Sequence, residues 1–227
     1  MKVPNYLGGE DHQRVSSAVS RAEADTAGEI LTILADRSDD YTDVALAWAI
    51  LASFAAITVF ALFPDAFLAR VDWLFGRWHP EWTLPQVLAL AVGIGTVKFL
   101  GVMLIQMIRP LKFLLIPSPI KTARVHERAI RAFRIGAERR TTGRTGILIY
   151  LSMREHRAEI VADEAIASKV DPQVWGGAME AMLAELKQGR TADGMIAAIE
   201  RVGAVLADHF PAARDDTNEL PDRLIEV

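Results

Sequence analysis

The 227-residue sequence contains no cysteine, which excludes a disulfide framework, a thiolate metal site and a cysteine nucleophile. It also lacks the GxSxG, P-loop, HExxH and GxGxxG motifs. Its five histidines are scattered, and none forms a pair at the spacing that metal ligands adopt on a helix. No catalytic or histidine metal site can therefore be assigned from motif spacing.

The net charge of the chain is also small, at −4. Proteins that bind nucleic acid usually carry a strongly basic domain or patch. We therefore expect no nucleic acid partner. Apolar residues make up 51% of the chain, which is enough for a full hydrophobic core.

Two long apolar runs, residues 44–63 and residues 87–108, are the most distinctive feature that is present. About 20 apolar residues suffice for a helix to cross the ~30 Å hydrocarbon layer of a membrane. Small residues such as Ala45, Ala49 and Ser53 recur at four-residue spacing, which lets membrane helices pack closely. We predict a transmembrane hairpin. The alternative is a pair of buried core helices, although such helices usually keep a polar stripe.

The segment between the runs, residues 64–86, contains three tryptophans, which favour the membrane–water boundary, so we predict that it lies along this interface. It holds two basic residues, Arg70 and Arg77. The other side holds seven: Arg37, Arg109, Lys112, Lys121, Arg124, Arg128 and Arg131. By the positive-inside rule, we predict an integral inner (cytoplasmic) membrane protein with its soluble domain and both termini in the cytoplasm.

Lys98 lies in the middle of the second run, where an ionisable side chain is costly. The first run offers no acidic residue to pair with it. Three interpretations stay open at this point. The lysine snorkels or pairs across an oligomer, the span begins further along the chain, or, as a minor alternative, the lysine serves transport.

A β-hairpin is predicted at residues 146–162. Residues 146–152 form an apolar, β-rich run, residues 153–156 are mostly polar, and residues 157–162 alternate between polar and apolar. Residues 29–35 form a similar run, and we expect the two runs to pair in one sheet. Apolar residues at helical spacing predict helices that begin near residues 10, 118, 171 and 192. The sequence thus predicts one small α/β domain that the transmembrane hairpin splits.

Acidic residues gather after the predicted strands. Asp39 and Asp40 follow the first strand, Asp163 follows the hairpin, and Asp193 opens the last helix. Ligands of open α/β sheets bind at the carboxyl ends of strands, and carboxylates suit hard cations. Aspartate is also common in turns and helix caps without any ligand. From the residues alone, both interpretations stay open.

Several short motifs resemble the TPM domain family. They are EADTAGEILTIL at residues 23–34, TGILIYLS at 145–152, EIVADEAI at 159–166, Trp175, and GRTADG at 189–194. The resemblance covers about residues 10–42 and 118–211. It implies a small α/β/α sandwich, interrupted here by the two-helix transmembrane hairpin. The predicted organisation is residues 1–43 and 109–211 for the two parts of the TPM-like domain, 44–108 for the hairpin with its interfacial loop, and 212–227 for an acidic C-terminal tail.

The resemblance also implies a site, because acidic loops bind divalent cations in some relatives and the plant members have acid phosphatase activity. Carried over by position, the candidate ligands for Ca²⁺ or Mg²⁺ are Asp39, Asp40, Asp163 and Asp193. No catalytic residue is assigned.

Two functions are compatible with these observations. The first is a membrane-anchored TPM domain protein that acts as a binding or assembly module at the cytoplasmic face. It would contact a protein partner and, through the arginine-rich helix that begins at Ser118, anionic membrane lipid. The alternative is a metal-dependent phosphatase, a phosphoric monoester hydrolase, in which an ion held by the same acidic cluster polarises a phosphoryl oxygen.

Overall fold

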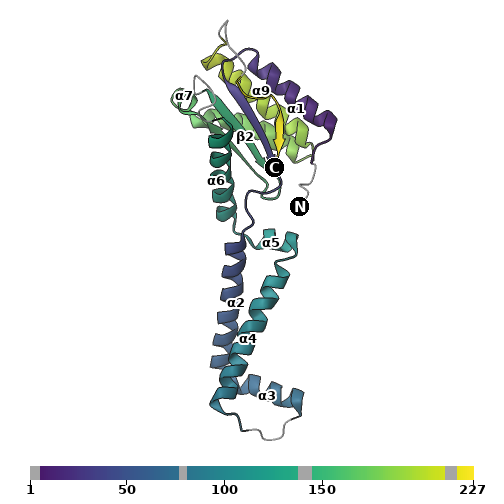
Figure 1. Cartoon of the computed structure of the whole chain (residues 1–227), viewed down its shortest axis with the longest axis vertical. Helices are drawn as coiled ribbons and strands as arrows, with labels where there is room; N and C mark the ends of the chain where they lie inside the picture. The colour runs from purple at the N-terminus through teal and green to yellow at the C-terminus, as the bar shows by residue number, and fades with distance from the viewer. Residues whose placement is uncertain (1–5, 77–80, 138–144, 213–218) are drawn as a thin grey trace. The chain divides into compact units, whose positions relative to one another are not determined.

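The computed structural model describes residues 6–76, 81–137, 145–212 and 219–227 (Figure 1). The chain divides into two compact units. Residues 1–39 and 118–227 form the first, here called the α/β unit, and residues 40–117 form the second, here called the helical unit. Residues 109–117, which the sequence analysis assigned to the α/β domain, therefore group with the helical unit.

The α/β unit is built on a mixed sheet, to which the described residues contribute four strands in the order β3-β2-β1-β4. The strands are β1 (Glu29–Ala35), β2 (Gly146–Ser152), β3 (Arg157–Ala162) and β4 (Leu224–Glu226). β1 runs parallel to β2 and to β4, whereas β3 is antiparallel to β2. The register aligns Glu29 with Gly146 and Ala35 with Ser152. The predicted α/β fold, the hairpin and its pairing with the first strand are confirmed.

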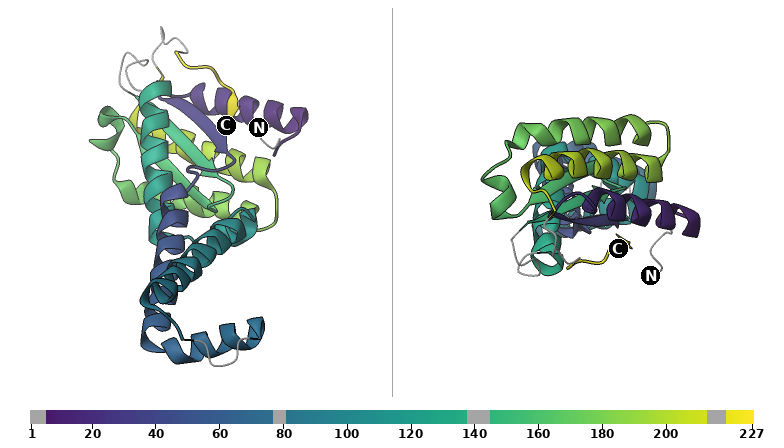
Figure 2. Two further views of the ribbon diagram at one scale, coloured as in Figure 1. Left: turned by 60° about the horizontal axis from the view of Figure 1, so that its bottom comes forward. Right: turned by 90° about the horizontal axis from the view of Figure 1, so that it is seen from above.

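Every residue of β1 and β2 is buried, because helices cover both faces of this sheet. On one face lie α1 (Gly9–Glu23), α8 (Trp175–Leu186) and α9 (Thr191–His209), with α1 and α9 side by side (Figure 2). On the other face lies α6 (Ser118–Gly136). A short helix, α7 (Glu164–Ala167), and a 3₁₀ turn, η1 (Pro172–Val174), connect β3 to α8.

The sequence of α6 explains how it packs. Val125, Ala129 and Phe133 are one helical turn apart, and all three are buried against the sheet. Full burial of an aromatic side chain such as that of Phe133 contributes about 2 kcal/mol. Gly136 permits close approach, because a Cβ there would lie only 2.6 Å from Leu31 Cδ2. The exposed positions of the helix include Arg128 and Arg131.

The end of the chain adds a strand that the sequence analysis did not predict. Residues 219–227, here called the C-terminal strap, lie along β1 and include β4. Leu220 and Leu224 of the strap are buried. Val227 N donates to Leu34 O at 3.0 Å, and Asp36 N donates to Val227 O at 2.8 Å. The last residues of the acidic tail predicted at residues 212–227 therefore belong to the sheet.

The helical unit contains α2 (Thr42–Leu62), α3 (Pro64–Phe75), α4 (Leu84–Ile105) and α5 (Arg109–Leu115). Within it, α2 packs against α4. Ser53 Oγ donates to Gly95 O at 2.9 Å, and a Cβ at Gly95 would lie 2.7 Å from Ile57 Cδ1. Small residues thus allow these two helices to approach closely. The helix α3 lies in the segment that was predicted only as an interfacial loop.

Among the described residues, α2 and α4 are long and apolar enough to cross a membrane. Many of their large apolar side chains are exposed, for example Phe54 at 66% and Val97 at 68%. α4 begins at Leu84, three residues ahead of the predicted run. Lys98 lies about two turns before the C-terminal end of α4, which is about 10 Å along its axis.

Candidate functional site at the carboxyl end of the central strands

The carboxyl ends of β1 and β2 meet at one edge of the sheet, because the two strands are parallel and Ala35 aligns with Ser152. The segments that follow them are joined by backbone hydrogen bonds. Met153 N donates to Ala35 O at 2.9 Å, and Arg154 N donates to Asp36 O at 3.0 Å. This is the edge at which ligands of α/β sheets usually bind. The polar residues gathered there, Tyr6, Asp36, Ser38, Ser152, Arg154 and Glu155, are here called the strand-end cluster.

Asp36 is held by two donors from different parts of the chain. The Tyr6 hydroxyl donates to Asp36 Oδ1, and Arg154 Nε lies 3.0 Å from Oδ1 and 3.2 Å from Oδ2. Burial alone would raise the pKa of Asp36, but the hydrogen bonds from Tyr6 and Arg154 outweigh it and hold that pKa below its ordinary value. Burial, and then the bond to Asp36, raises the pKa of Tyr6 to about 12. At neutral pH the pair is therefore an ionised carboxylate and a neutral phenol.

Glu155 is the buried acid of the cluster, with only 2% of its surface exposed. Ser38 N donates to its Oε1 at 2.9 Å, and the Ser152 hydroxyl donates to its Oε2. The Ser38 hydroxyl in turn lies 3.0 Å from Ser152 Oγ and 3.2 Å from Tyr150 Oη. Burial raises the pKa of Tyr150 above its ordinary value. These bonds fasten the loop after β1 to the turn between β2 and β3.

Asp39, one of the predicted metal ligands, lies in the same loop. Its Oδ2 is 3.3 Å from Arg124 Nε of α6, and Arg124 NH1 also lies 3.9 Å from Glu127 Oε2. Asp40, the next predicted ligand, is exposed and is the first residue of the helical unit. Asp39, in the loop after β1, and Arg124 of α6 thus form an ion pair next to the strand-end cluster.

Asp163 does not lie at this edge. β3 is antiparallel to β2, so the hairpin returns the chain to the edge where β2 begins, and Asp163 N donates to Gly146 O at 2.9 Å. A seven-residue strand spans about 20 Å, which separates Asp163 from the loop of Asp39. Asp163 Oδ1 accepts from Glu164 N, while its buried Oδ2 has no hydrogen-bond partner in the described ranges.

Asp193 is engaged by arginines at the start of α9. It forms an ion pair with Arg14 of α1, and its Oδ2 lies 3.6 Å from Arg190 Nε. The structure therefore does not bring Asp163 and Asp193 together with Asp39 into one site. Across the residues that the structure describes, no three acidic or histidine side chains are arranged to hold a metal ion. The expectation of a shared acidic cluster is corrected, because it overlooked the reversal of direction in the hairpin.

A different group of acids lies at the amino end of β1. Glu29 is buried, and its two carboxylate oxygens accept from Glu219 N and Leu220 N of the strap, both at 3.1 Å. Glu23 Oε1 accepts from Ile30 N at 2.7 Å. Burial raises the pKa of Glu23 to about 8, and the nearby acids Glu29 and Asp222 add to the shift. The sequence analysis missed this group, whose only sequence signal is two acids that flank a buried strand start.

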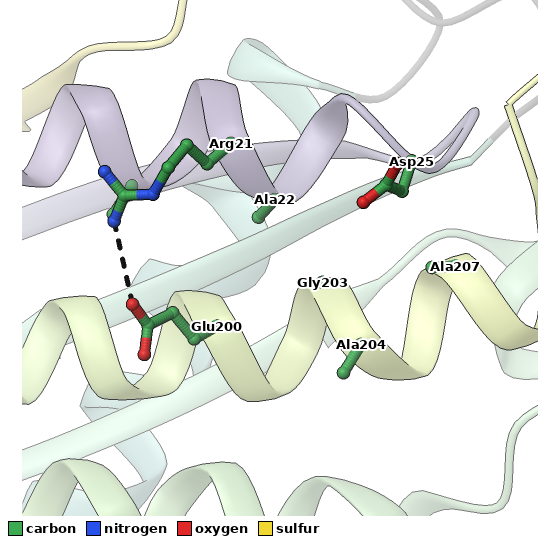
Figure 3. A pocket seen from close by; sticks show the side chains of 8 residues that line it. Arg21, Ala22, Asp25, Glu200, Gly203, Ala204 and Ala207 are labelled. Atoms are coloured by element: carbon green, nitrogen blue, oxygen red, sulfur yellow. Dashed lines mark ion pairs between the residues drawn. The ribbon is translucent and has the colours of Figure 1, made fainter.

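A groove of about 220 Å³ lies between α1 and α9 (Figure 3). Small residues form most of its wall, and Arg21 NH2 lies 3.6 Å from Glu200 Oε1 across it. The helices approach closely at Gly203, where a Cβ would lie 2.6 Å from Ala22 Cβ. The groove thus results from tight helix packing, and its polar lining consists of that ion pair and Asp25.

Comparison with known proteins relates part of this chain to a protein family. A model of the TPM domain family matches residues 113–205. Among solved structures, the NMR structure of the BA42 protein from the psychrophilic bacterium Bizionia argentinensis is similar to this chain, with a TM-score of 0.57 and 19% identity over 100% of this chain and 99% of that one. No curated protein matches the sequence. At this identity the structural likeness shows the fold alone.

Proposed function

The chain belongs to the TPM domain family, and we propose that it is a membrane-anchored binding or assembly module whose small α/β/α sandwich lies at the cytoplasmic face of the inner membrane. In this proposal α2 and α4 are two transmembrane helices inserted between β1 and α6. The module binds a protein partner there, and the helical unit serves as its anchor.

The observation that carries the proposal is the apolar surface of the helical unit. Val92, Val97 and Leu104 of α4 are each about two-thirds exposed within this chain, and α2 exposes Phe54 to a similar extent. In water such a surface would aggregate, whereas hydrocarbon covers it without cost. The close packing around Gly95 supports a hairpin that inserts as one piece.

The orientation rests on the seven basic residues that flank the outer ends of the two helices, against two between them. Arg128 and Arg131 of α6 are exposed, and arginines on a helix that begins soon after a span would contact anionic lipid headgroups.

Thiol labelling tests the anchor and its orientation, because the chain contains no cysteine of its own. Single cysteines replace Trp73, which is 84% exposed in α3, and Gln13, which is exposed in α1. We expect a membrane-impermeant maleimide to label Trp73→Cys in spheroplasts and Gln13→Cys only after lysis. Release of the chain from membranes by alkaline carbonate would contradict the proposal.

The binding role is tested by photo-crosslinking in intact cells. A photoreactive residue at Arg128 on α6 should capture a discrete protein, and the same residue at Gln13 on α1 serves as the matched control. Recovery of the chain alone from both positions, at native expression, would count against a binding module.

A metal-dependent phosphatase is the second candidate, supported by the ionised Asp36 and the nearby Asp39 at the edge of the sheet where ligands usually bind. It predicts p-nitrophenyl phosphate hydrolysis that needs Mg²⁺ or Ca²⁺ and is lost in the folded Asp39→Asn, Asp40→Asn double variant. The module proposal predicts no aspartate-dependent release.

Divalent cation binding stays a prediction for Asp39, Asp40, Asp163 and Asp193. Calorimetric titration of Ca²⁺ into single Asp→Asn variants would assign any binding site among them. Because Asp163 lies about 20 Å from Asp39, the two should act independently.

A further inference from the structure

The C-terminal strap is held at its beginning by acids from three segments. Glu29 of β1 accepts from the strap amides of Glu219 and Leu220, each at 3.1 Å. Asp222 of the strap accepts from the Ser20 hydroxyl of α1. Glu23 of α1 lies among them, because its Oε1 accepts from Ile30 N of β1 at 2.7 Å and Asp222 of the strap interacts with its carboxyl group. Three carboxyl groups thus share one partly buried place.

The strap is weakly attached to the sheet, because it pairs with β1 over only three residues, from Thr32 to Leu34. β2, on the other side, pairs with β1 over all seven residues. Departure of the strap would uncover the backbone groups along that edge of β1, where another extended segment could pair.

We propose that the C-terminal strap is a latch, which the Glu23–Glu29–Asp222 cluster holds on β1 and releases as the medium becomes alkaline. This inference is independent of the proposed function, because it concerns only the α/β unit.

Burial and the charges around Glu23 together explain the direction. Burial disfavours its ionised form most, and the acids Glu29 on β1 and Asp222 on the strap disfavour it further. The other charged groups nearby are Arg21 on α1, Asp25 just after it, Glu200 on α9, paired with Arg21, and Glu219 and Arg223 on the strap. Protonated Glu23 carries no charge and does not repel Asp222. Ionised Glu23 adds a negative charge beside Asp222, and the repulsion between the two carboxylates weakens the binding of the strap to β1.

The pH window follows from linkage. With the strap bound, the pKa of Glu23 is raised to about 8 from an ordinary 4.5, so the bound state holds a proton that the released state gives up. Strap binding is therefore strongest below the ordinary value. It weakens as pH rises toward about 8, by at most tenfold per pH unit, and is constant above that.

Hydrogen exchange of the full chain in detergent tests the latch. Protection factors, which correct for the chemical effect of pH, are measured for strap amides between pH 5.5 and 9. We expect strap protection in the parent chain to fall at least tenfold across this range and then level off, while β2 stays protected. In Glu23→Gln, which mimics the protonated form, strap protection should not change with pH.

Two further variants keep the test decisive. His12→Gln removes the 3.0 Å pair between His12 and Glu226 at the far end of the strap, and it should keep the parent's pH dependence. If Glu23→Gln does not fold, Asp222→Asn serves instead and should shift the fall toward lower pH. Three results would overturn the latch: an unchanged slope in the folded Glu23→Gln variant, or a fall that is not shifted in the folded Asp222→Asn variant; loss of the slope in His12→Gln; or equal loss of protection in β2.

Discussion

The two ends of β1 carry acidic side chains in opposite electrostatic settings. At the carboxyl end, Asp36 has the donors Tyr6 and Arg154, and its pKa is lowered. At the amino end, burial raises the pKa of Glu23, and the neighbouring acids Glu29 and Asp222 add to the shift. Burial acts in the same direction on both acids, but only Asp36 has donors that outweigh it. One end of the strand is therefore held by an ionised carboxylate, whereas the acid at the other end is sensitive to pH.

The largest effect should come from removing the cation at the carboxyl end. Arg154→Ala leaves Asp36 partly buried without its charged donor, and we expect a loss of about 2 to 3 kcal/mol in the free energy of unfolding. Urea denaturation of the detergent-solubilised chain, followed by circular dichroism, measures it. Arg131→Ala, an exposed arginine on α6, is the control and should change stability by less than ~0.5 kcal/mol. Equal losses in both variants would remove the contrast between the ends.

A substitution that moves α1 away from α9 should destabilise the group around Glu23 at the amino end of β1. A methyl group at Gly203 would lie 2.6 Å from Ala22 Cβ, one residue before Glu23, so Gly203→Ala should cost about 1 to 3 kcal/mol through overpacking. The thermal midpoint should fall by several degrees. Gly177→Ala in α8 has no atom within 4 Å of the new Cβ and should leave stability equal or slightly higher. A tolerated Gly203→Ala would show that the helices can separate freely.

The pH dependence of stability should differ between the ends. Glu23 carries a raised pKa, so its contribution to stability is present below about 4.5 and is lost as pH rises to about 8. Glu23→Gln should therefore gain about 1 to 2 kcal/mol over the parent at pH 8.5 and little at pH 5. Urea midpoints at the two pH values check this. A gain in stability of the same size at both pH values would mean that the variant changes packing and not the charge of Glu23.

The smallest effect should come from the neutral donor to Asp36. Tyr6→Phe removes one hydrogen bond but leaves Arg154, so we expect a loss of about 1 kcal/mol. The phenol of Tyr6 should ionise near pH 12, and the ultraviolet absorbance difference between Tyr6→Phe and the parent would report it. Ionisation of that phenol near its ordinary pKa of 10 would mean that Tyr6 does not donate to Asp36 in solution.

Local pattern was sufficient to predict much of the fold. β1, β2 and β3 begin and end where the sequence indicated, because an unbroken apolar run and an alternating run each have one simple interpretation. β4 was missed because Leu224–Glu226 is short and acquires strand geometry only beside β1. The helix α3 was missed because the tryptophans and prolines of residues 64–86 favoured an interfacial loop over a helix.

The candidate site was less predictable than the fold. Asp39 was correctly placed after β1, but the grouping of Asp163 with it was wrong, since an antiparallel return moves a residue to the opposite edge. Arg154 and Glu155 were treated as turn residues. Their contacts with Asp36 and Ser38 depend on the parallel register of β1 and β2, which the sequence of neither strand specifies alone.

The insertion of the helical unit between β1 and β2 affects the order of synthesis. Ala27 and Thr145, which meet at the start of the two strands, are 118 positions apart in the chain. At about 5 to 20 residues per second, β1 leaves the ribosome roughly 6 to 24 s before its partner strand exists. During that interval a strand that is fully buried in the folded protein has no sheet to join and can aggregate. Nascent α1 and β1 therefore stay without their main sheet partner until β2 has been synthesised.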